Sequence, residues 1–167
     1  MKPSKSVFEE AVKFEALKLE AYLCPANVWT IGIGTTVYPN GKRVQKGDKC
    51  TREQAIQYFL HDMGLVATQV DSVTIDNINQ NQFDALCLFV YNVGFPAYKN
   101  SNLRKRVNAN PKDVAIRLEF DKWTKANGEH NKKDDDGDGL IDEVGEKQIL
   151  GGLIKRRTAE ANLYFRV

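Results

Sequence analysis

The side chain that suggests chemistry most strongly is Glu15, a carboxylate near the end of the first helical pattern. Phe8, Ala11 and Val12 recur at helical spacing and define an apolar stripe, and Glu15 falls on that stripe beyond Val12. Burial there would raise the pKa of the carboxyl group and keep it protonated near neutral pH. Such a group can act as a general acid toward a glycosidic oxygen. The helix alone leaves a second interpretation open, in which Glu15 is solvated or paired with an arginine.

A strand pattern places a hydroxyl group after this carboxylate. Residues 28–34 alternate with period two, so that Thr30, Gly32 and Gly34 share one face and larger apolar residues share the other. One side of the strand is then packed, whereas the other is bare backbone with a single hydroxyl. We expect a sugar ring to approach that bare side closely.

An acidic segment at residues 134–146 has the pattern of a calcium-binding loop. Asp134, Asp136 and Asp138 occupy loop positions one, three and five, and a glycine follows at position six. Position twelve is a glycine rather than a carboxylate, so Asp142, Glu143 or Glu146 would have to close the loop. We therefore predict a structural or regulatory Ca²⁺ site made by Asp134, Asp136, Asp138, Asp142 and Glu143. The alternative is a solvated acidic loop without metal.

The elements that must position these residues follow from capping and periodicity. Ser6-x-x-Glu9 predicts a helix that runs to about Leu17, and Thr51-x-x-Gln54 predicts a second helix that runs to about residue 70. Asn40-Gly41 predicts a hairpin turn after the strand. Helical spacing recurs over residues 81–93, 102–108, 111–125 and 151–165. The pattern predicts an α+β fold, with a small N-terminal lobe that contains a β-hairpin and a larger helical lobe.

Length and composition favour one domain over residues 1–167. Seven of the 22 acidic residues fall in the segment 134–146, and the remaining 15 face 24 basic residues, so the body favours an anionic polymer such as nucleic acid or cell wall. No aromatic-interleaved basic motif supports nucleic acid. Cys24, Cys50 and Cys87 lack the spacing of disulfides or zinc ligands, and we expect Cys50 and Cys87 to be buried thiols.

Several segments resemble those of phage-type lysozymes, glycoside hydrolase family 24, in order along nearly the whole chain. They are Phe14-Glu15-Ala16-Leu17-Lys18-Leu19-Glu20-Ala21-Tyr22, Trp29-Thr30-Ile31-Gly32-Ile33-Gly34-Thr35-Thr36, Phe83-Asp84-Ala85-Leu86, Val90-Tyr91-Asn92-Val93-Gly94 and Gly152-Leu153-Ile154-Lys155-Arg156-Arg157-Thr158-Ala159-Glu160. The resemblance implies a lysozyme-like fold with the active-site cleft between the two lobes. It also implies hydrolysis of the β-1,4 bond between N-acetylmuramic acid and N-acetylglucosamine in peptidoglycan.

The family's catalytic triad is a Glu, an Asp or occasionally Cys after eight intervening residues, and a Thr after five more. Glu15, Cys24 and Thr30 stand at that spacing. The resemblance implies that Glu15 protonates the leaving oxygen and that Thr30 helps to hold the attacking water. A thiol with a pKa near 8.5 is mostly neutral at pH 7, so Cys24 does not simply replace a carboxylate. It is a thiolate of lowered pKa, a water-positioning group or an inert turn residue.

Other positions are carried over from the same family. Tyr91 and Asn92 match residues that line the cleft and suit acetamido sugars, although helix packing is the alternative for both. Arg156 and Arg157 more often pair with acids of the first helix than contact substrate. The family usually has a Gly after the catalytic Glu and a His after the strand motif, where this chain has Ala16 and Thr35. The acidic segment looks like an insertion before the last helix.

The sequence thus predicts an endolysin-like muramidase, with peptidoglycan as partner and no organic cofactor. The alternative is a non-catalytic, calcium-dependent wall-binding module on a lysozyme scaffold disabled by Cys24. No apolar signal segment or stretch of about 18 apolar residues is present, which favours synthesis in the host cytoplasm and no stable membrane insertion. We expect a monomer that reaches the periplasm or cell wall through a separate membrane-permeabilising, holin-like protein.

Overall fold

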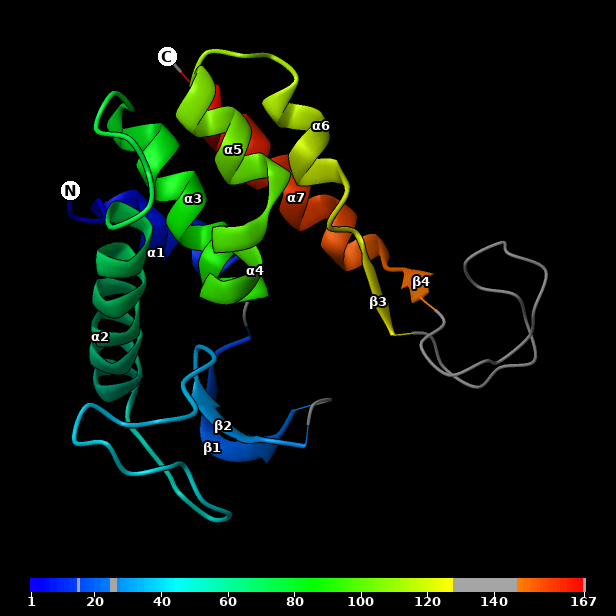
Figure 1. Ribbon diagram of the computed structural model, residues 1–167. Helices are drawn as coiled ribbons and strands as arrows, with labels where there is room; N and C mark the ends of the chain where they lie inside the picture. The colour runs from blue at the N-terminus through cyan, green and yellow to red at the C-terminus, as the bar shows by residue number, and fades with distance from the viewer. Residues whose placement is uncertain (15, 25–26, 128–146, 167) are drawn as a thin grey trace.

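The computed structural model describes residues 1–14, 16–24, 27–127 and 147–166. Its two sheets each contain two antiparallel strands, β1 (Lys18–Leu23) with β2 (Trp29–Gly32), and β3 (Lys125–Asn127) with β4 (Lys147–Ile149). Seven helices are found in these ranges: α1 (Lys5–Ala11), α2 (Arg52–Asp71), α3 (Gln80–Val93), α4 (Phe95–Asn100), α5 (Asn102–Ala109), α6 (Ile116–Asp121) and α7 (Gly151–Tyr164). The β1–β2 hairpin and the loops before α2 form a small lobe below the helices in Figure 1. The predicted α+β division into a small β-containing lobe and a larger helical lobe is confirmed.

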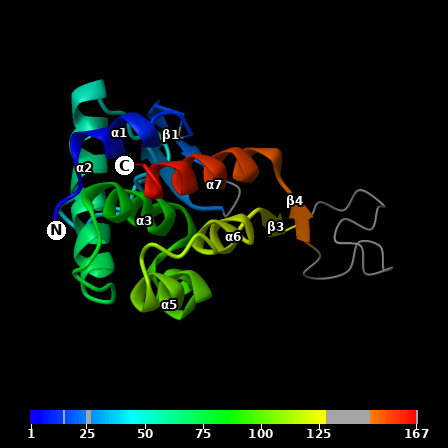
Figure 2. The same ribbon diagram turned by 90° about the horizontal axis from the view of Figure 1, so that it is seen from above.

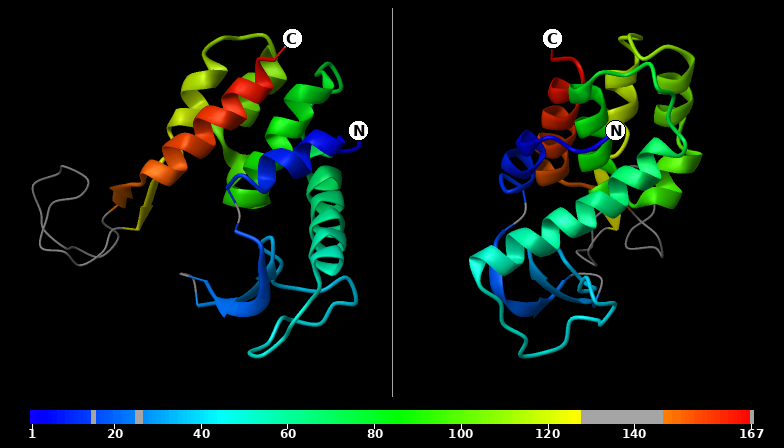
Figure 3. Two further views of the ribbon diagram at one scale, coloured as in Figure 1. Left: turned by 180° about the vertical axis from the view of Figure 1, so that it is seen from behind. Right: turned by 90° about the vertical axis from the view of Figure 1, so that its left-hand side faces the viewer.

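Helix α2 joins the two lobes, because it begins beside the hairpin loops and ends among the other helices (Figure 3). The predicted capping box is present: the Thr51 hydroxyl accepts from the Gln54 N–H at 3.2 Å, and the Gln54 side chain accepts from the Thr51 N–H at 2.9 Å. One face of the helix is buried, at Ala55, Phe59, Met63, Ala67 and Val70. A single rigid element therefore fixes the small lobe relative to the large one.

Helix α3 forms the centre of the large lobe, with α7 and α6 beside it when the molecule is seen from above (Figure 2). Every residue from Gln82 to Val90 is buried, as expected for a helix surrounded by others. It contacts α1, α2, α4 and α7. Cys87 lies in this buried stretch as predicted, whereas Cys50 is only partly buried. Among the described residues, no helix is long and apolar enough to cross a membrane.

The first helix is shorter than predicted. It ends at Ala11, and the next residues form a turn in which Lys13 N–H donates to the Glu10 carbonyl and Phe14 N–H to the Ala11 carbonyl. The buried positions are Val7 and Ala11, while Val12 is 39% exposed. The helical stripe that was expected to carry the Glu15 carboxylate therefore ends at Ala11, and residue 15 itself lies outside the described residues.

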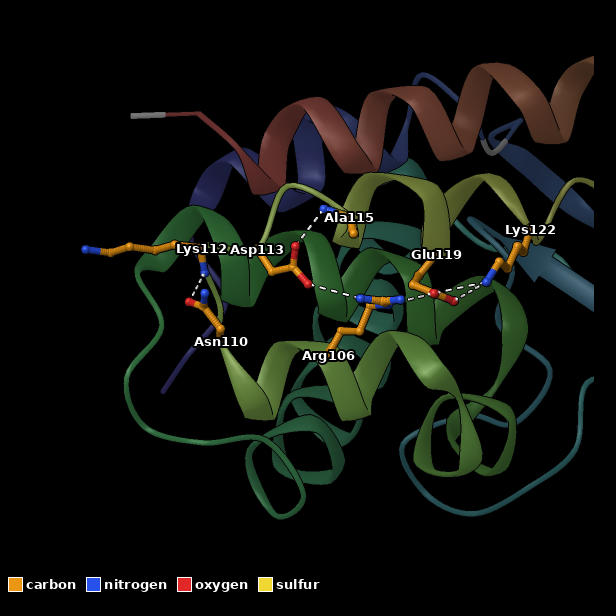
Figure 4. Close-up of polar contacts among 7 residues, drawn as sticks. All are labelled: Arg106, Asn110, Lys112, Asp113, Ala115, Glu119 and Lys122. Atoms are coloured by element: carbon orange, nitrogen blue, oxygen red, sulfur yellow. Dashed lines mark hydrogen bonds and ion pairs between the residues drawn. The ribbon is translucent and has the colours of Figure 1, made fainter.

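The predicted helix over residues 111–125 is also shorter, because local hydrogen bonds occupy its first part. The Asn110 side chain accepts from the Lys112 N–H at 3.1 Å, and the Asp113 side chain accepts from the Ala115 N–H at 2.9 Å, so α6 begins only at Ile116. Figure 4 shows how this turn is held against α5: Arg106 donates to Asp113 at 3.1 Å and to Glu119 at 2.9 Å. Helix α4 and strands β1, β3 and β4 were not predicted.

Candidate active site

A cleft of about 530 Å³ contains most of the described residues that the sequence singled out. Cys24 and Thr30 line it from the β-hairpin, and Tyr91 and Asn92 line it from α3. Its other lining residues are Tyr22, Gly34, Thr36, Val37, Asp62, Val66, Gln69, Val90, Gly94 and Phe95. The cleft is thus lined by residues of both lobes and by three residues of α2, Asp62, Val66 and Gln69. Glu15 lies outside the described residues, and so does the whole predicted calcium loop with Asp134, Asp136, Asp138, Asp142 and Glu143.

Cys24 and Thr30 are tied to the same backbone atom. The carbonyl oxygen of Val28 accepts the Cys24 N–H at 3.0 Å and the Thr30 hydroxyl at 3.0 Å. Thr30 is 4% exposed, so its hydroxyl has a fixed donor direction. With its proton directed at Val28, the Thr30 oxygen keeps its lone pairs for a donor that enters the cleft. The site can therefore hold a water molecule through an accepted hydrogen bond.

The loop after β2 is tight and depends on two glycines. Ile31 and Thr35 exchange backbone hydrogen bonds at 2.9 and 3.0 Å, with Gly32 at φ +67° and Gly34 at φ +104°. A Cβ on Gly32 would lie 3.1 Å from the Cβ of Ala55 on α2. The prediction that Gly32 leaves a bare face for a sugar ring is wrong, because that position accommodates α2. Gly34 does line the cleft.

Two hydrogen bonds hold this loop to the helices. The Tyr91 hydroxyl donates to the Ile33 carbonyl at 2.8 Å, and the Thr35 hydroxyl donates to Asp62 Oδ2 at 2.7 Å. Burial raises the pKa of the Asp62 carboxyl, although the bond from Thr35 and the nearby His61 act in the opposite direction. The first bond joins the small lobe to α3 and the second joins it to α2. These bonds fix the width of the cleft next to Thr30.

Asn92 is oriented by a buried cation from the last helix. Arg157 is fully buried and donates to the Asn92 side-chain oxygen at 2.7 Å and to Glu160 at 2.8 Å. Burial lowers the pKa of Arg157 to about 10, so it remains a cation at neutral pH. Because the carbonyl oxygen of Asn92 is used in this way, its NH₂ group is the donor left for the cleft. Arg157 also lies over the Phe89 ring, at 4.8 Å from the centroid.

Sequence reasoning missed Asp62, Val66 and Gln69, which line the cleft from α2. Their spacing of four and then three residues places them on one face of the helix, so the pattern was visible. Nothing in the sequence shows which face of α2 meets the cleft, because that depends on packing against Gly32. In the described ranges, no group of three or more His, Cys, Asp or Glu is arranged to hold a metal ion.

The two lobes and the cleft between them define a lysozyme-like protein, and comparison with known proteins supports this class. The family model described as phage lysozyme matches residues 12–160. The endolysin of Acyrthosiphon pisum secondary endosymbiont phage 1 is 34% identical over 152 residues, which cover 91% of this chain and 90% of that protein. The chain belongs to the phage lysozyme family.

Solved structures agree with this assignment. The endolysin from Escherichia coli O157:H7 phage FAHEc1 superposes with a TM-score of 0.82 and 33% identity, covering 99% of this chain and 94% of that one. The muramidase domain of SpmX from Asticaccaulis excentricus gives a TM-score of 0.80 and 28% identity, covering 99% of both chains. The lysozyme-like fold that the sequence predicted is confirmed.

Proposed function

We propose that Glu15, Cys24 and Thr30 form the catalytic group of this endolysin, which hydrolyses the glycan of peptidoglycan. Membership of the phage lysozyme family makes the chain a glycoside hydrolase of the muramidase type. The observation that supports the residue assignment is that Cys24 and Thr30 of the small lobe line the same cleft as Tyr91 and Asn92 of α3. The bond cut is the β-1,4 linkage between N-acetylmuramic acid and N-acetylglucosamine.

Each residue has a distinct role in this proposal. Glu15 gives its proton to the leaving glycosidic oxygen as the bond breaks. Thr30 accepts a hydrogen bond from the attacking water, because its own proton is directed at the Val28 carbonyl. The Asn92 NH₂ group donates to the acetamido carbonyl of a bound sugar, and Tyr91 supports the cleft wall through its bond to Ile33.

Lysis of permeabilised bacteria, followed by turbidity, tests the role of Glu15. Glu15→Gln keeps the size of the side chain but removes the proton donor, and we expect lysis to stop. Glu9→Gln is the matched control, because Glu9 is an exposed glutamate of α1 outside the cleft lining, and it should lyse at the normal rate. A wall-binding module without activity would sediment with intact walls as the parent, as Glu15→Gln and as Glu9→Gln. That result would contradict the proposal that the protein is an enzyme.

The role of Cys24 needs its own series of variants. Cys24→Asp restores the residue type common in the family and should lyse at least as fast as the parent. Cys24→Ser keeps a small polar group that can position water, whereas Cys24→Ala removes both the ionisable thiol and any group that could position water. If the Ala variant lyses walls at the parent rate, Cys24 has no part in the mechanism.

The calcium loop is a second proposal, and it rests on the sequence pattern. Oxygen ligands from Asp134, Asp136 and Asp138, completed by Asp142 or Glu143, would bind Ca²⁺ outside the inner membrane, where the ion is plentiful. Binding would neutralise part of the seven negative charges of the segment and stabilise the enzyme where it acts. Millimolar Ca²⁺ should raise the melting temperature relative to EDTA, and Asp136→Asn should remove the increase. An unchanged melting temperature and lytic rate would rule the site out.

The route to the wall is proposed from the endolysin relatives. The enzyme is made in the host cytoplasm as a monomer and reaches peptidoglycan after a separate, holin-like protein opens the inner membrane. Expression alone should leave host cells intact, while co-expression of a membrane-permeabilising protein should lyse them. Lysis without that protein would contradict this route. Gel filtration of the purified chain tests the monomer.

A further inference from the structure

A second hollow, of about 460 Å³, lies in the small lobe next to the cleft. Its lining includes Tyr38, Asn40, Lys42, Asp48, Lys49 and Tyr58. Val37 lines the cleft, whereas the next residue, Tyr38, lines the hollow. The chain is extended here, because Val37 forms a β-bridge with Arg43, and successive side chains of an extended chain point to opposite sides. On α2, Tyr58 faces the hollow and Asp62, one turn later, faces the cleft. The two depressions are therefore neighbours, separated by one segment of chain.

Two tyrosine rings form an aromatic corner in this hollow. The centroids of Tyr38 and Tyr58 are 5.1 Å apart and their planes meet at 63°. The Tyr38 hydroxyl donates to Asp48 Oδ2 at 2.9 Å, and the Gln45 N–H donates to the same oxygen at 2.9 Å. Burial, together with the bond to Asp48, raises the pKa of Tyr38 to about 12, so the phenol stays protonated. The corner is preorganised, and Asp48 serves to hold it in place.

The chain segment that supplies most of the hollow's lining is rich in basic residues, and Lys42 and Lys49 are the two that line the hollow. Residues 38–52 contain five Lys or Arg and one Asp. The Lys49 ammonium group is bound to Glu20 at 2.7 Å, so it is already neutralised. Lys42 is exposed and enters none of the ion pairs found among the described residues. The Lys42 ammonium group thus lies at the hollow outside any of these ion pairs, and the hollow's one lining carboxylate, Asp48, is already bound by the Tyr38 hydroxyl and the Gln45 N–H.

We propose that the Tyr38–Tyr58 hollow is a second binding site, which takes an anionic saccharide unit of the cell wall. The tyrosine rings would pack against the apolar face of a sugar ring, and Lys42 would bind the carboxylate or phosphate that the sugar carries. The inference rests on the proposed function, because the substrate of the cleft is the same wall. Engagement of neighbouring strands by cleft and hollow would raise the local concentration of the enzyme on an insoluble substrate.

The first experiment is an NMR titration with small probes that contain no glycosidic bond to cut. The probes are N-acetylmuramic acid, whose lactyl group carries a carboxylate, glycerol phosphate, which carries phosphate, and neutral N-acetylglucosamine. We expect amide shifts around Tyr38, Lys42 and Tyr58 with at least one anionic probe, and much smaller shifts there with the neutral sugar. The probe that causes these shifts shows whether the hollow binds the carboxylates or the phosphates of the wall. Because no probe can be hydrolysed, this result stands apart from the lysis test of Glu15.

The second experiment measures sedimentation with purified walls, with Glu15→Gln in every variant. We expect Lys42→Glu and Tyr58→Leu each to weaken wall binding about tenfold, because they remove the charge and an aromatic ring separately. Lys105→Glu makes the same charge change at an exposed position of α5 and should leave binding unchanged. The proposal fails if neither anionic probe shifts the hollow, if either hollow variant binds walls normally, or if Lys105→Glu binds as weakly as Lys42→Glu.

Discussion

Removing one oxygen atom, in Tyr91→Phe, tests whether the bond between the lobes sets the geometry of the cleft. The Tyr91 hydroxyl donates to the Ile33 carbonyl at 2.8 Å, two residues before the second tether at Thr35. Losing such a bond costs about 1 kcal/mol, and up to about 3 if the carbonyl stays buried without a donor. For a chain of this size, that corresponds to a fall in melting temperature of roughly 2–12 °C. The ring itself remains, so the cleft keeps its apolar lining.

The effect on lysis separates a structural role from a functional one. If the loop shifts by a fraction of an ångström, Thr30 moves with it, and we expect the lytic rate to fall about tenfold. Tyr164→Phe is a matched control, because the Tyr164 hydroxyl donates to the Pro111 carbonyl at 3.0 Å inside the helical lobe. That variant should lose about 1 kcal/mol, at the lower end of the range, because the Pro111 carbonyl keeps a hydrogen bond from Gln82 at 2.8 Å, and it should lyse normally below its melting temperature. Equal lytic rates for the two variants would refute the reasoning.

Three further predictions concern stability, measured by urea unfolding. Burial opposes the charged form of Glu119, but hydrogen bonds and ion pairs from Lys122 and Arg106 outweigh it and lower the pKa of this carboxyl group. The contribution of Glu119 to the free energy of unfolding is therefore fully present above the ordinary pKa and is lost as the pH falls through the pKa of the folded state. Glu119→Gln should therefore cost about 1 kcal/mol at pH 7 and almost nothing near pH 2. Gly32→Ala should cost roughly 2–3 kcal/mol, because it combines a left-handed backbone with a tight contact; a cost below about 1 kcal/mol would contradict this. Burial raises the pKa of Asp62, so the contribution of this carboxyl group to the free energy of unfolding is greatest below its ordinary pKa and falls as the pH rises. Asp62→Asn should therefore gain stability relative to the parent as the pH is raised from 4 to 7.

Local signals in the sequence were sufficient for the long helices. The capping residues of α2 and the apolar pattern of α3 each define their element without reference to the rest of the fold. The end of α1 could not be read in the same way. Leu17, Leu19, Ala21 and Leu23 alternate with period two, which marks β1, but the preceding residues favoured continuing the helix. Leu17, Leu19 and Leu23 are exposed, so this alternation does not correspond to a buried face that would distinguish a strand from a continued helix.

The cleft was predictable in its residues but not in its internal contacts. The resemblance brought Cys24, Thr30, Tyr91 and Asn92 to one site, and the structure does gather these four around one cleft. The partners of these side chains come from distant segments, such as Arg157 for Asn92. Pairs of this kind depend on how helices pack, which one sequence without relatives does not show. For the same reason the sequence predicts an open face at Gly32, whereas this residue packs against Ala55 of α2.

The arrangement around Val28 makes Cys24 a favourable position for separating chemistry from geometry. Cys24 is held there by its backbone N–H, and Thr30 is held by its hydroxyl, both on the same carbonyl oxygen. Replacing the Cys24 side chain with Ala, Ser or Asp leaves that backbone bond in place, so the position of Thr30 should not change. Differences in lytic rate within the series then report on charge and hydrogen bonding at the second position of the proposed catalytic group. A Thr30→Val change would act differently, because it removes both the acceptor proposed for the attacking water and the bond to Val28.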